Sequence, residues 1–181
     1  MCGECCRGLK EGEVYLYLED IKRLSDVLKL KGTEGLRQFA EKYLKITNDS
    51  FYWKKPGAQR RKKYFIKTLG FKFIGDDEHC EFLMGNKCSI HEARPFQCRC
   101  FPFWQMMIKS PKEIREYAKK CPGLRDLNSE NAKYYSGEEI YDWARREYEL
   151  EKKYFLKLKR NNFNIFKVYK FLPADLPEDE N

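Results

Sequence analysis

Apolar residues recur at helical spacing through much of the chain. A first helix is predicted from about residue 19 to residue 29, with an apolar face of Ile21, Leu24, Val27 and Leu28. Gly32 ends it, and Thr33 is a suitable cap for a second helix. That helix has an apolar stripe of Leu36, Phe39, Ala40, Tyr43 and Leu44. Both stripes are typical of faces packed against a core.

Two capping boxes predict further helices in the second half of the chain. Ser110-Pro111-Lys112-Glu113 opens a helix that should end near Cys121, just before Pro122-Gly123. Ser136-Gly137-Glu138-Glu139 opens the longest one, about 24 residues. Its apolar positions are Ile140, Trp143, Ala144, Tyr148, Tyr154, Phe155 and Leu158.

Strand signals are fewer and shorter. Residues 64–74 are rich in aromatic and branched side chains and are β-prone, and residues 14–18 form either a short strand or a buried entry into the first helix. The expected fold is therefore mostly α with a few short β strands (α+β), with a long C-terminal helix. We expect a single domain over residues 1–181, with a compact cysteine-rich core at 1–123, a helical scaffold at 124–172 and a frayed acidic tail at 173–181.

Eight cysteines change this picture most. They stand at Cys2, Cys5, Cys6, Cys80, Cys88, Cys98, Cys100 and Cys121, and the last sixty residues contain none. The first residues carry no apolar leader of the kind that precedes export to an oxidising compartment, where disulfides persist. A cytoplasmic protein is expected, and no apolar run predicts a membrane span. Clustering of the thiols favours a metal centre over disulfides or scattered core cysteines.

The first cysteine group has the spacing of a metal-binding knuckle. In Cys2-Gly3-Glu4-Cys5 a tight turn aims two sulfurs at one ion, and Gly3 relaxes the steric limits on that turn. Adjacent residues tend to point their side chains apart, so Cys5 and Cys6 are expected to serve two metals, or a metal and the core.

The second group is dispersed. Gly85-Asn86 is a turn signal, so Cys80 and Cys88 are expected to face each other across a hairpin-like loop. Pro95 opens a helical turn with Cys98 one turn inside. One knuckle followed by single cysteines is not the spacing of a standard zinc finger or ribbon.

These residues resemble the CxxCxxCC (YkgJ-type) family of zinc- or iron-chelating domains. The resemblance covers about residues 1–123, in the blocks Cys2–Gly8, Glu19–Leu24, Cys80–Leu83, Cys88–Ile90, Glu92–Pro95, Cys98–Phe103 and Cys121–Gly123. Flagellin lysine N-methylase carries a similar cysteine domain, so a lysine methyltransferase-like enzyme is an alternative. The fullest form of the family has a further cysteine three residues before the position of Cys2, and it usually carries tyrosine at the position of His91.

The resemblance implies a thiolate-bound centre. The expected ligands are Cys2, Cys5, Cys6, Cys80, Cys88, Cys98 and Cys121, with Cys100 in reserve. Arg94 and Arg99 are expected beside the bound cofactor, supplying charge and hydrogen bonds to thiolates. Seven ligands exceed one tetrahedral site, so the cofactor is either a 4Fe-4S iron–sulfur cluster or zinc. The dispersed spacing slightly favours the cluster. His79 and His91 are expected to pack or to support ligands.

The net charge of +8 adds a second question. Lys54, Lys55, Arg60, Arg61, Lys62, Lys63 and Lys67 gather around Pro56-Gly57, with Phe51, Tyr52, Trp53, Tyr64 and Phe65 beside them. Cations among aromatic rings suit nucleic acid, so a zinc-stabilised nucleic-acid-binding module using residues 54–67 is an alternative. The interpretation of this segment as a solvated, lysine-rich surface loop is favoured over nucleic-acid binding, and binding of a protein partner is a third alternative. The sequence contains no phosphate-binding loop and no hydrolase triad that would indicate an enzyme.

Overall fold

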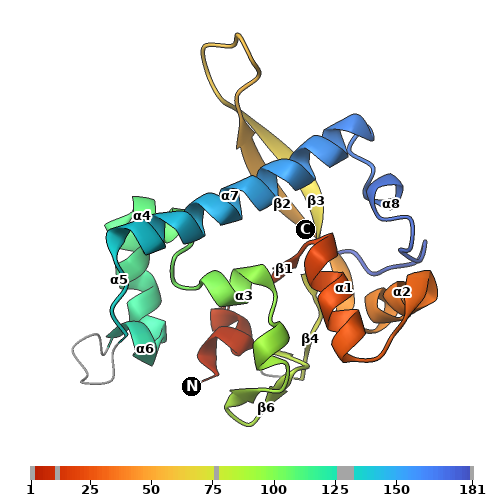
Figure 1. The fold of residues 1–181 in the computed structure, drawn as a ribbon, viewed down its shortest axis with the longest axis horizontal. Coiled ribbons are helices and arrows are strands. Elements are labelled where there is room, and N and C mark those ends of the chain that lie inside the picture. Colours follow the sequence, from red (N-terminus) through yellow and green to blue (C-terminus); the bar gives the residue numbers. More distant parts are fainter. Residues whose placement is uncertain (1–2, 11–12, 76–77, 126–132, 180–181) are drawn as a thin grey trace. The chain divides into compact units, whose positions relative to one another are not determined.

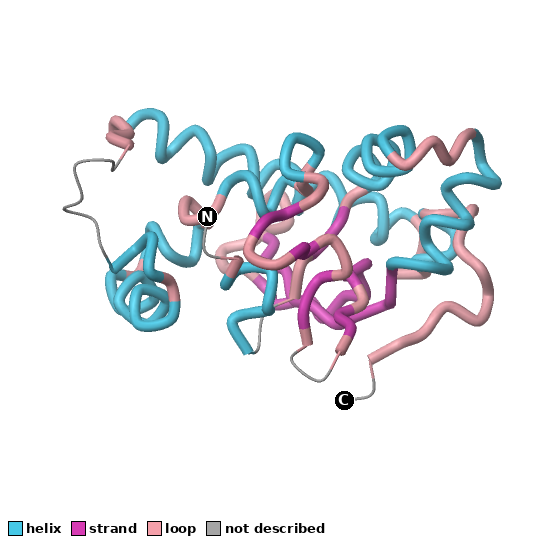
Figure 2. Tube along the Cα trace, turned by 90° about the horizontal axis from the view of Figure 1, so that it is seen from below, coloured by secondary structure: helices cyan, strands magenta, loops and turns pink. Residues whose placement is uncertain are grey.

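The computed structural model describes residues 3–10, 13–75, 78–125 and 133–179. Most of its trace is helix or loop, and the strands form small sheets (Figure 2). The α+β prediction is confirmed. The chain divides into two compact units, each built from two separate segments. We call Met1–Val14 with Lys72–Glu149 the thiol unit, and Tyr15–Phe71 with Leu150–Asn181 the sheet unit.

The two units do not follow the boundary expected near residue 123. The segment 15–71, placed by the prediction in the cysteine-rich core, contains none of the cysteines and belongs to the sheet unit. The long helix contributes its first part to the thiol unit and its last part to the sheet unit. The single-domain assignment stays a prediction.

The sheet unit is organised around one long hairpin (Figure 1). Strands β2 (Leu44–Trp53) and β3 (Lys62–Phe71) pair antiparallel over their whole length, and β1 (Tyr15–Leu16) pairs with the other edge of β3. The helices of the unit are α1 (Leu18–Val27), α2 (Gly32–Tyr43), α8 (Ile165–Val168) and the last part of α7 (Gly137–Arg160).

A dense apolar core holds the sheet unit together. Phe155 on α7 lies between the ring of Phe51 on β2, at 4.9 Å between centroids, and the ring of Tyr64 on β3, at 5.1 Å. The tyrosine hydroxyl of Tyr154 donates to the Lys67 carbonyl at 2.7 Å. The side chains that are almost fully buried are Leu16, Ile21, Leu24, Phe39, Leu44, Ile46, Leu69, Phe155 and Leu158.

Several helix boundaries match the prediction, and four details differ from it. The first helix is α1, and Gly32, at positive φ, begins α2 instead of ending the helix before it. The N-cap of α2 is Lys31 and not Thr33. Leu44 was predicted on the apolar stripe of the second helix, but it is the first residue of β2, a strand that the pattern did not indicate. The acidic tail was expected to be frayed, yet Leu176 is buried and Asp179 N–H donates to the Ile46 carbonyl at 2.9 Å, along the free edge of β2.

The thiol unit consists of short elements. Its strands are β4 (Phe73–Ile74), β5 (His79–Cys80), β6 (Leu83–Met84) and β7 (Lys87–Cys88), paired as β4–β5 and β6–β7. Its helical elements are η1 (Glu4–Lys10), η2 (His91–Ala93), α3 (Phe96–Cys100), α4 (Gln105–Lys109), α5 (Pro111–Lys120), α6 (Pro122–Arg125) and the start of α7.

Both predicted capping boxes stand at helix starts. Glu113 N–H donates to Ser110 Oγ at 3.4 Å, which opens α5. Glu139 N–H donates to Ser136 Oγ at 3.2 Å while Ser136 N–H donates to Glu139 Oε2 at 2.8 Å, a reciprocal pair that opens α7. The predicted length of the longest helix, α7, is confirmed at 24 residues.

Candidate metal centre

The first cysteines lie on a tight 3-10 turn that glycine makes possible. Gly3 has φ +76°, and Cys6 N–H donates to its carbonyl at 2.9 Å. A Cβ on Gly3 would stand 3.3 Å from the Cα of Asn86, so a side chain there would press the turn away from the β6–β7 hairpin. Cys2 lies outside the described residues, and the first half of the knuckle stays a prediction.

Three thiols of this region are linked through Cys6. Cys6 is hydrogen-bonded both to its neighbour Cys5 and to Cys88 at the end of β7. Cys5 is exposed, and the other two are half-buried. Cys5 and Cys6 were expected to point apart, yet their side chains are hydrogen-bonded to each other. No motif in the sequence indicated the contact with Cys88, which depends on how η1 packs against the hairpin.

The hydrogen bonds divide these thiols by protonation. The bond from Cys6 lowers the pKa of Cys5 and of Cys88, since it favours their thiolates. The same bonds raise the pKa of Cys6, whose proton they engage, and burial adds to that effect. The positive charge of Arg94 lowers the pKa of both Cys5 and Cys88.

The pKa values of Cys80 and Cys98 are raised by burial, and the charges of Cys5 and Cys88 are among the other causes. Burial raises the pKa of Cys80 to about 11, and the charges of Cys88 and Cys5 act in the same direction. Burial also raises the pKa of Cys98 well above its ordinary value, with Cys5 among the thiols that add to the shift. Cys80 pairs with Phe73 on β4–β5 while Cys88 pairs with Leu83, so the two do not share one hairpin as expected. The predicted turn at Gly85-Asn86 does join β6 to β7.

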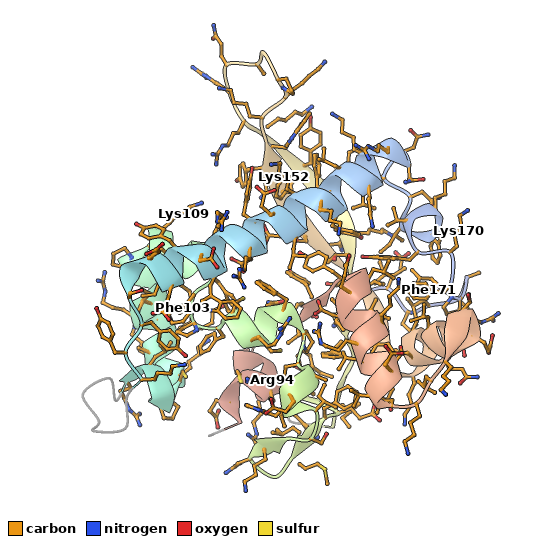
Figure 3. The ribbon with its side chains drawn as sticks, viewed as in Figure 1. Arg94, Phe103, Lys109, Lys152, Lys170 and Phe171 are labelled. Atoms are coloured by element: carbon orange, nitrogen blue, oxygen red, sulfur yellow. The ribbon has the colours of Figure 1, made fainter. Side chains whose placement is uncertain are left out.

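Arginine side chains connect and charge the site. Arg94, labelled in Figure 3, donates from Nε to the His91 carbonyl at 3.0 Å and acts electrostatically on Cys5, Cys88 and Cys98. Arg7 donates to the Gly85 carbonyl at 3.5 Å and so ties η1 to the β6–β7 turn. Arg99 is exposed, with its guanidinium 5.6 Å from the centroid of the Phe96 ring.

The remaining predicted residues have other surroundings. Cys121 caps α5 and is buried with Met107 and Leu124, against Phe101, Trp104, Tyr117 and Ala118. Cys100 is fully buried and donates to the Gln97 carbonyl at 3.4 Å. His91 Nδ1 lies 2.9 Å from Glu92 Oε1.

Gln97 is a positioning residue that the sequence did not single out. Its side-chain amide donates to the Glu13 carbonyl at 3.0 Å and thereby fastens the N-terminal segment to α3. Its carbonyl accepts from Trp104 Nε1 at 2.9 Å. A lone glutamine among cysteines carries no pattern that would mark it, because its role depends on the approach of a distant segment.

The donor set fits a thiophilic metal. Five cysteines influence one another, two have lowered pKa values, and a cation stands beside them. In the described residues no three Cys, His, Asp or Glu side chains already have metal-ligand spacing, so closing a site requires rotation of neighbouring thiols.

Comparison with known families identifies the family of the chain. The model of the CxxCxxCC family, described as "Putative zinc- or iron-chelating domain", matches residues 1–122. The chain belongs to the CxxCxxCC family. All eight cysteines lie inside the matched region, so family membership supports metal binding by these residues. No solved structure matches the chain. Of the helices that the structure describes, none has the length and apolar character needed to cross a membrane.

Proposed function

We propose that this CxxCxxCC protein binds one metal ion, zinc or iron, through thiolates centred on Cys5, Cys6 and Cys88. The hydrogen-bonded contact of these three sulfurs carries the proposal. Zn–S bonds of about 2.3 Å place tetrahedral ligands roughly 3.8 Å apart, which is the separation of thiols in contact. A 4Fe-4S cluster, the rival cofactor, distributes its four thiolates over four irons and sets them wider apart.

The other thiols complete the proposed ligand set. Besides burial, the charges of Cys5 and Cys88 raise the pKa of both Cys80 and Cys98, and either of these thiols supplies a fourth sulfur. Cys2 precedes the described residues and stays a predicted ligand. Cys121 also stays a predicted ligand, although its contacts are with apolar side chains.

Arg94 is the proposed supporting group. Four thiolates around a divalent ion leave a net charge of −2, and the guanidinium offsets part of it without competing for the metal. A bound metal supplies cross-linking and, for iron, electron transfer. The residues of the chain deliver the thiolates, hold the turn at Gly3 and keep the charge of the site in balance.

The test is metal content and cobalt(II) spectroscopy of protein purified without oxygen. We expect about one zinc or iron per chain and no acid-labile sulfide. Cobalt(II) in the same site should show the charge-transfer absorption of a tetrahedral thiolate centre. About four irons with matching sulfide would overturn the single-ion proposal in favour of the cluster.

Matched serine variants locate the ligands. Cys6→Ser and Cys88→Ser should lower metal content at least tenfold and weaken the cobalt absorption. Cys100→Ser is the matched control, because that thiol is fully buried and donates to a carbonyl. Equal metal loss in Cys100→Ser and Cys88→Ser would refute the proposed ligand centre. Cys121→Ser decides the remaining prediction, since unchanged metal content would remove it from the ligand set.

A further inference from the structure

The segment from the loop between β2 and β3 into the start of β3 carries the highest net positive charge of the chain. Residues 54–63 contain six cations, and no acidic residue occurs between Asp49 and Asp76. Ala58 N–H donates to the Lys55 carbonyl at 3.0 Å, closing a turn over Pro56 and Gly57, and Gly57 has φ +80°. This compact turn places Lys54 and Lys55 on one side of the loop and Arg60 and Arg61 on the other. Figure 3 shows long nitrogen-tipped side chains spreading from this loop.

The half of the hairpin nearer the loop has one covered face and one bare face. Register pairs Phe51 with Tyr64, and both rings pack against Phe155 of α7. Side chains alternate along a strand, so Tyr52, opposite Lys63, points to the other face. Phe65 lies on that same face two residues beyond Lys63. Tyr52 is 53% exposed and Phe65 is 80% exposed.

Lys63 stands between these two rings. Its Nζ lies 5.9 Å from the centroid of Tyr52 and 4.9 Å from that of Phe65. An aromatic ring left in water on a sheet forgoes the free energy of burial. Two such rings, held on paired strands with a lysine between them, offer aromatic surface and positive charge together.

We propose that the bare face of this hairpin binds single-stranded nucleic acid. Bases stack on Tyr52 and Phe65, and Lys63 with the cations of the loop contacts the phosphates. The ligand class follows from the pairing of ring faces with six clustered cations. Farther from the loop on the same face, Lys67 is paired with Glu178. This inference concerns the sheet unit and is independent of the metal centre.

An anionic membrane is the rival ligand, and the loop argues against it. A hairpin that enters a lipid interface needs bulky apolar residues at its tip. The tip reads Lys-Lys-Pro-Gly-Ala-Gln-Arg-Arg, with the two exposed rings set back on the strands. Such rings reach a base lying along the ribbon more readily than an acyl chain.

The first experiment measures binding of a fluorescein-labelled 15-nucleotide RNA of mixed sequence to the full chain. We expect micromolar affinity at about 50 mM salt. The slope of log K against log salt should be about −3 to −4, as for four to six phosphates on a single strand. Vesicles containing phosphatidylserine are the parallel probe, and binding to vesicles without binding to RNA would overturn the proposal.

Two sets of variants separate charge from stacking. Arg60→Glu, Arg61→Glu, Lys62→Glu and Lys63→Glu combined should reduce RNA affinity at least 30-fold. The charge-matched control combines Lys22→Glu, Lys31→Glu, Lys167→Glu and Lys170→Glu, all at exposed positions in the same unit. A loss of the same size in the control would show nonspecific attraction by net charge and would refute the site.

Tyr52→Leu with Phe65→Leu keeps apolar bulk and removes the rings. Loss of stacking on each ring should lower RNA affinity about 5- to 100-fold. Vesicle binding should be unchanged. Tyr52→Trp with Phe65→Trp should retain affinity within about threefold, and RNA should quench the new tryptophan fluorescence. Both positions are exposed, so folding is expected to be preserved, and circular dichroism checks it. Wild-type affinity in the leucine variant would refute stacking.

Discussion

The two units maintain their structure by different means. The sheet unit pairs two ten-residue strands and buries a set of large side chains almost completely. Every strand that the structure describes in the thiol unit has two residues, and one of its buried apolar clusters contains Met107, Cys121 and Leu124. Short ladders and few buried side chains contribute little free energy of folding. Where the apolar core is small, the thiols are the remaining means of cross-linking distant segments.

Metal removal is the largest expected effect on this contrast. A structural metal contributes on the order of 10 kcal/mol in small thiolate sites. Chelation should therefore abolish hydrogen-exchange protection around Cys80 and Cys88 while β2 and β3 stay protected. Exchange measured by mass spectrometry on the loaded and chelated protein checks this. Loss of protection in both units together would contradict separate stabilisation.

Removal of Phe155 should have the opposite distribution. Phe155→Ala deletes a fully buried ring that contacts both long strands, which costs about 3–5 kcal/mol. Protection of β2 and β3 should decrease, and metal content should remain that of the wild type. Phe163→Ala, at a 39% exposed ring beside Tyr64, is the control with a smaller loss. Metal loss in Phe155→Ala would show that the two units fold as one.

A change of pH should alter the stability of the thiol unit, which contains Glu147, more than that of the sheet unit. Partial burial raises the pKa of this carboxyl from 4.5 to about 7, although Gln105 N–H donates to it at 2.6 Å. A raised carboxyl pKa stabilises the fold below pH 4.5, and this contribution is lost as pH rises through about 7. Glu147→Gln, always neutral, should flatten the pH dependence of thiol-unit protection by about 1–2 kcal/mol after solvent screening.

Unfolding of the sheet unit serves as the internal reference for that measurement. Its protection between pH 5 and pH 8 should be the same in Glu147→Gln and wild type. An identical pH profile of the thiol unit in both proteins would contradict the burial assigned to this carboxyl.

The smallest expected effect concerns the start of α7. Ser136→Ala removes the Oγ that accepts from Glu139 N–H, at a cost of about 1 kcal/mol. Exchange should quicken in the first turn and remain unchanged around Phe155, at the packed end of the helix. Ser136→Asp, which can still accept the hydrogen bond, should restore protection. Equal acceleration along the whole helix would show that its two ends are coupled.

Local signals in the sequence predicted much of the architecture. Capping boxes at Ser110 and Ser136 fixed helix starts, and Gly85-Asn86 fixed a turn, because these features act within four residues. The sequence pattern did not predict strand β2, because Asn48 and Asp49 interrupt its β-prone residues. Its structure comes from pairing with β3, a contact between segments that are separate in the sequence.

The sequence by itself determined that this chain is a thiol-rich protein of the CxxCxxCC family with a long final helix. Spacing and residue chemistry suffice for that, since a knuckle, a cap or a run of lysines is a local property. Only the tertiary structure decided that Cys6 has both Cys5 and Cys88 as partners, and that Tyr52 and Phe65 lie on a bare face. Both depend on which distant segments pack together, and that choice is made by burial over the whole fold.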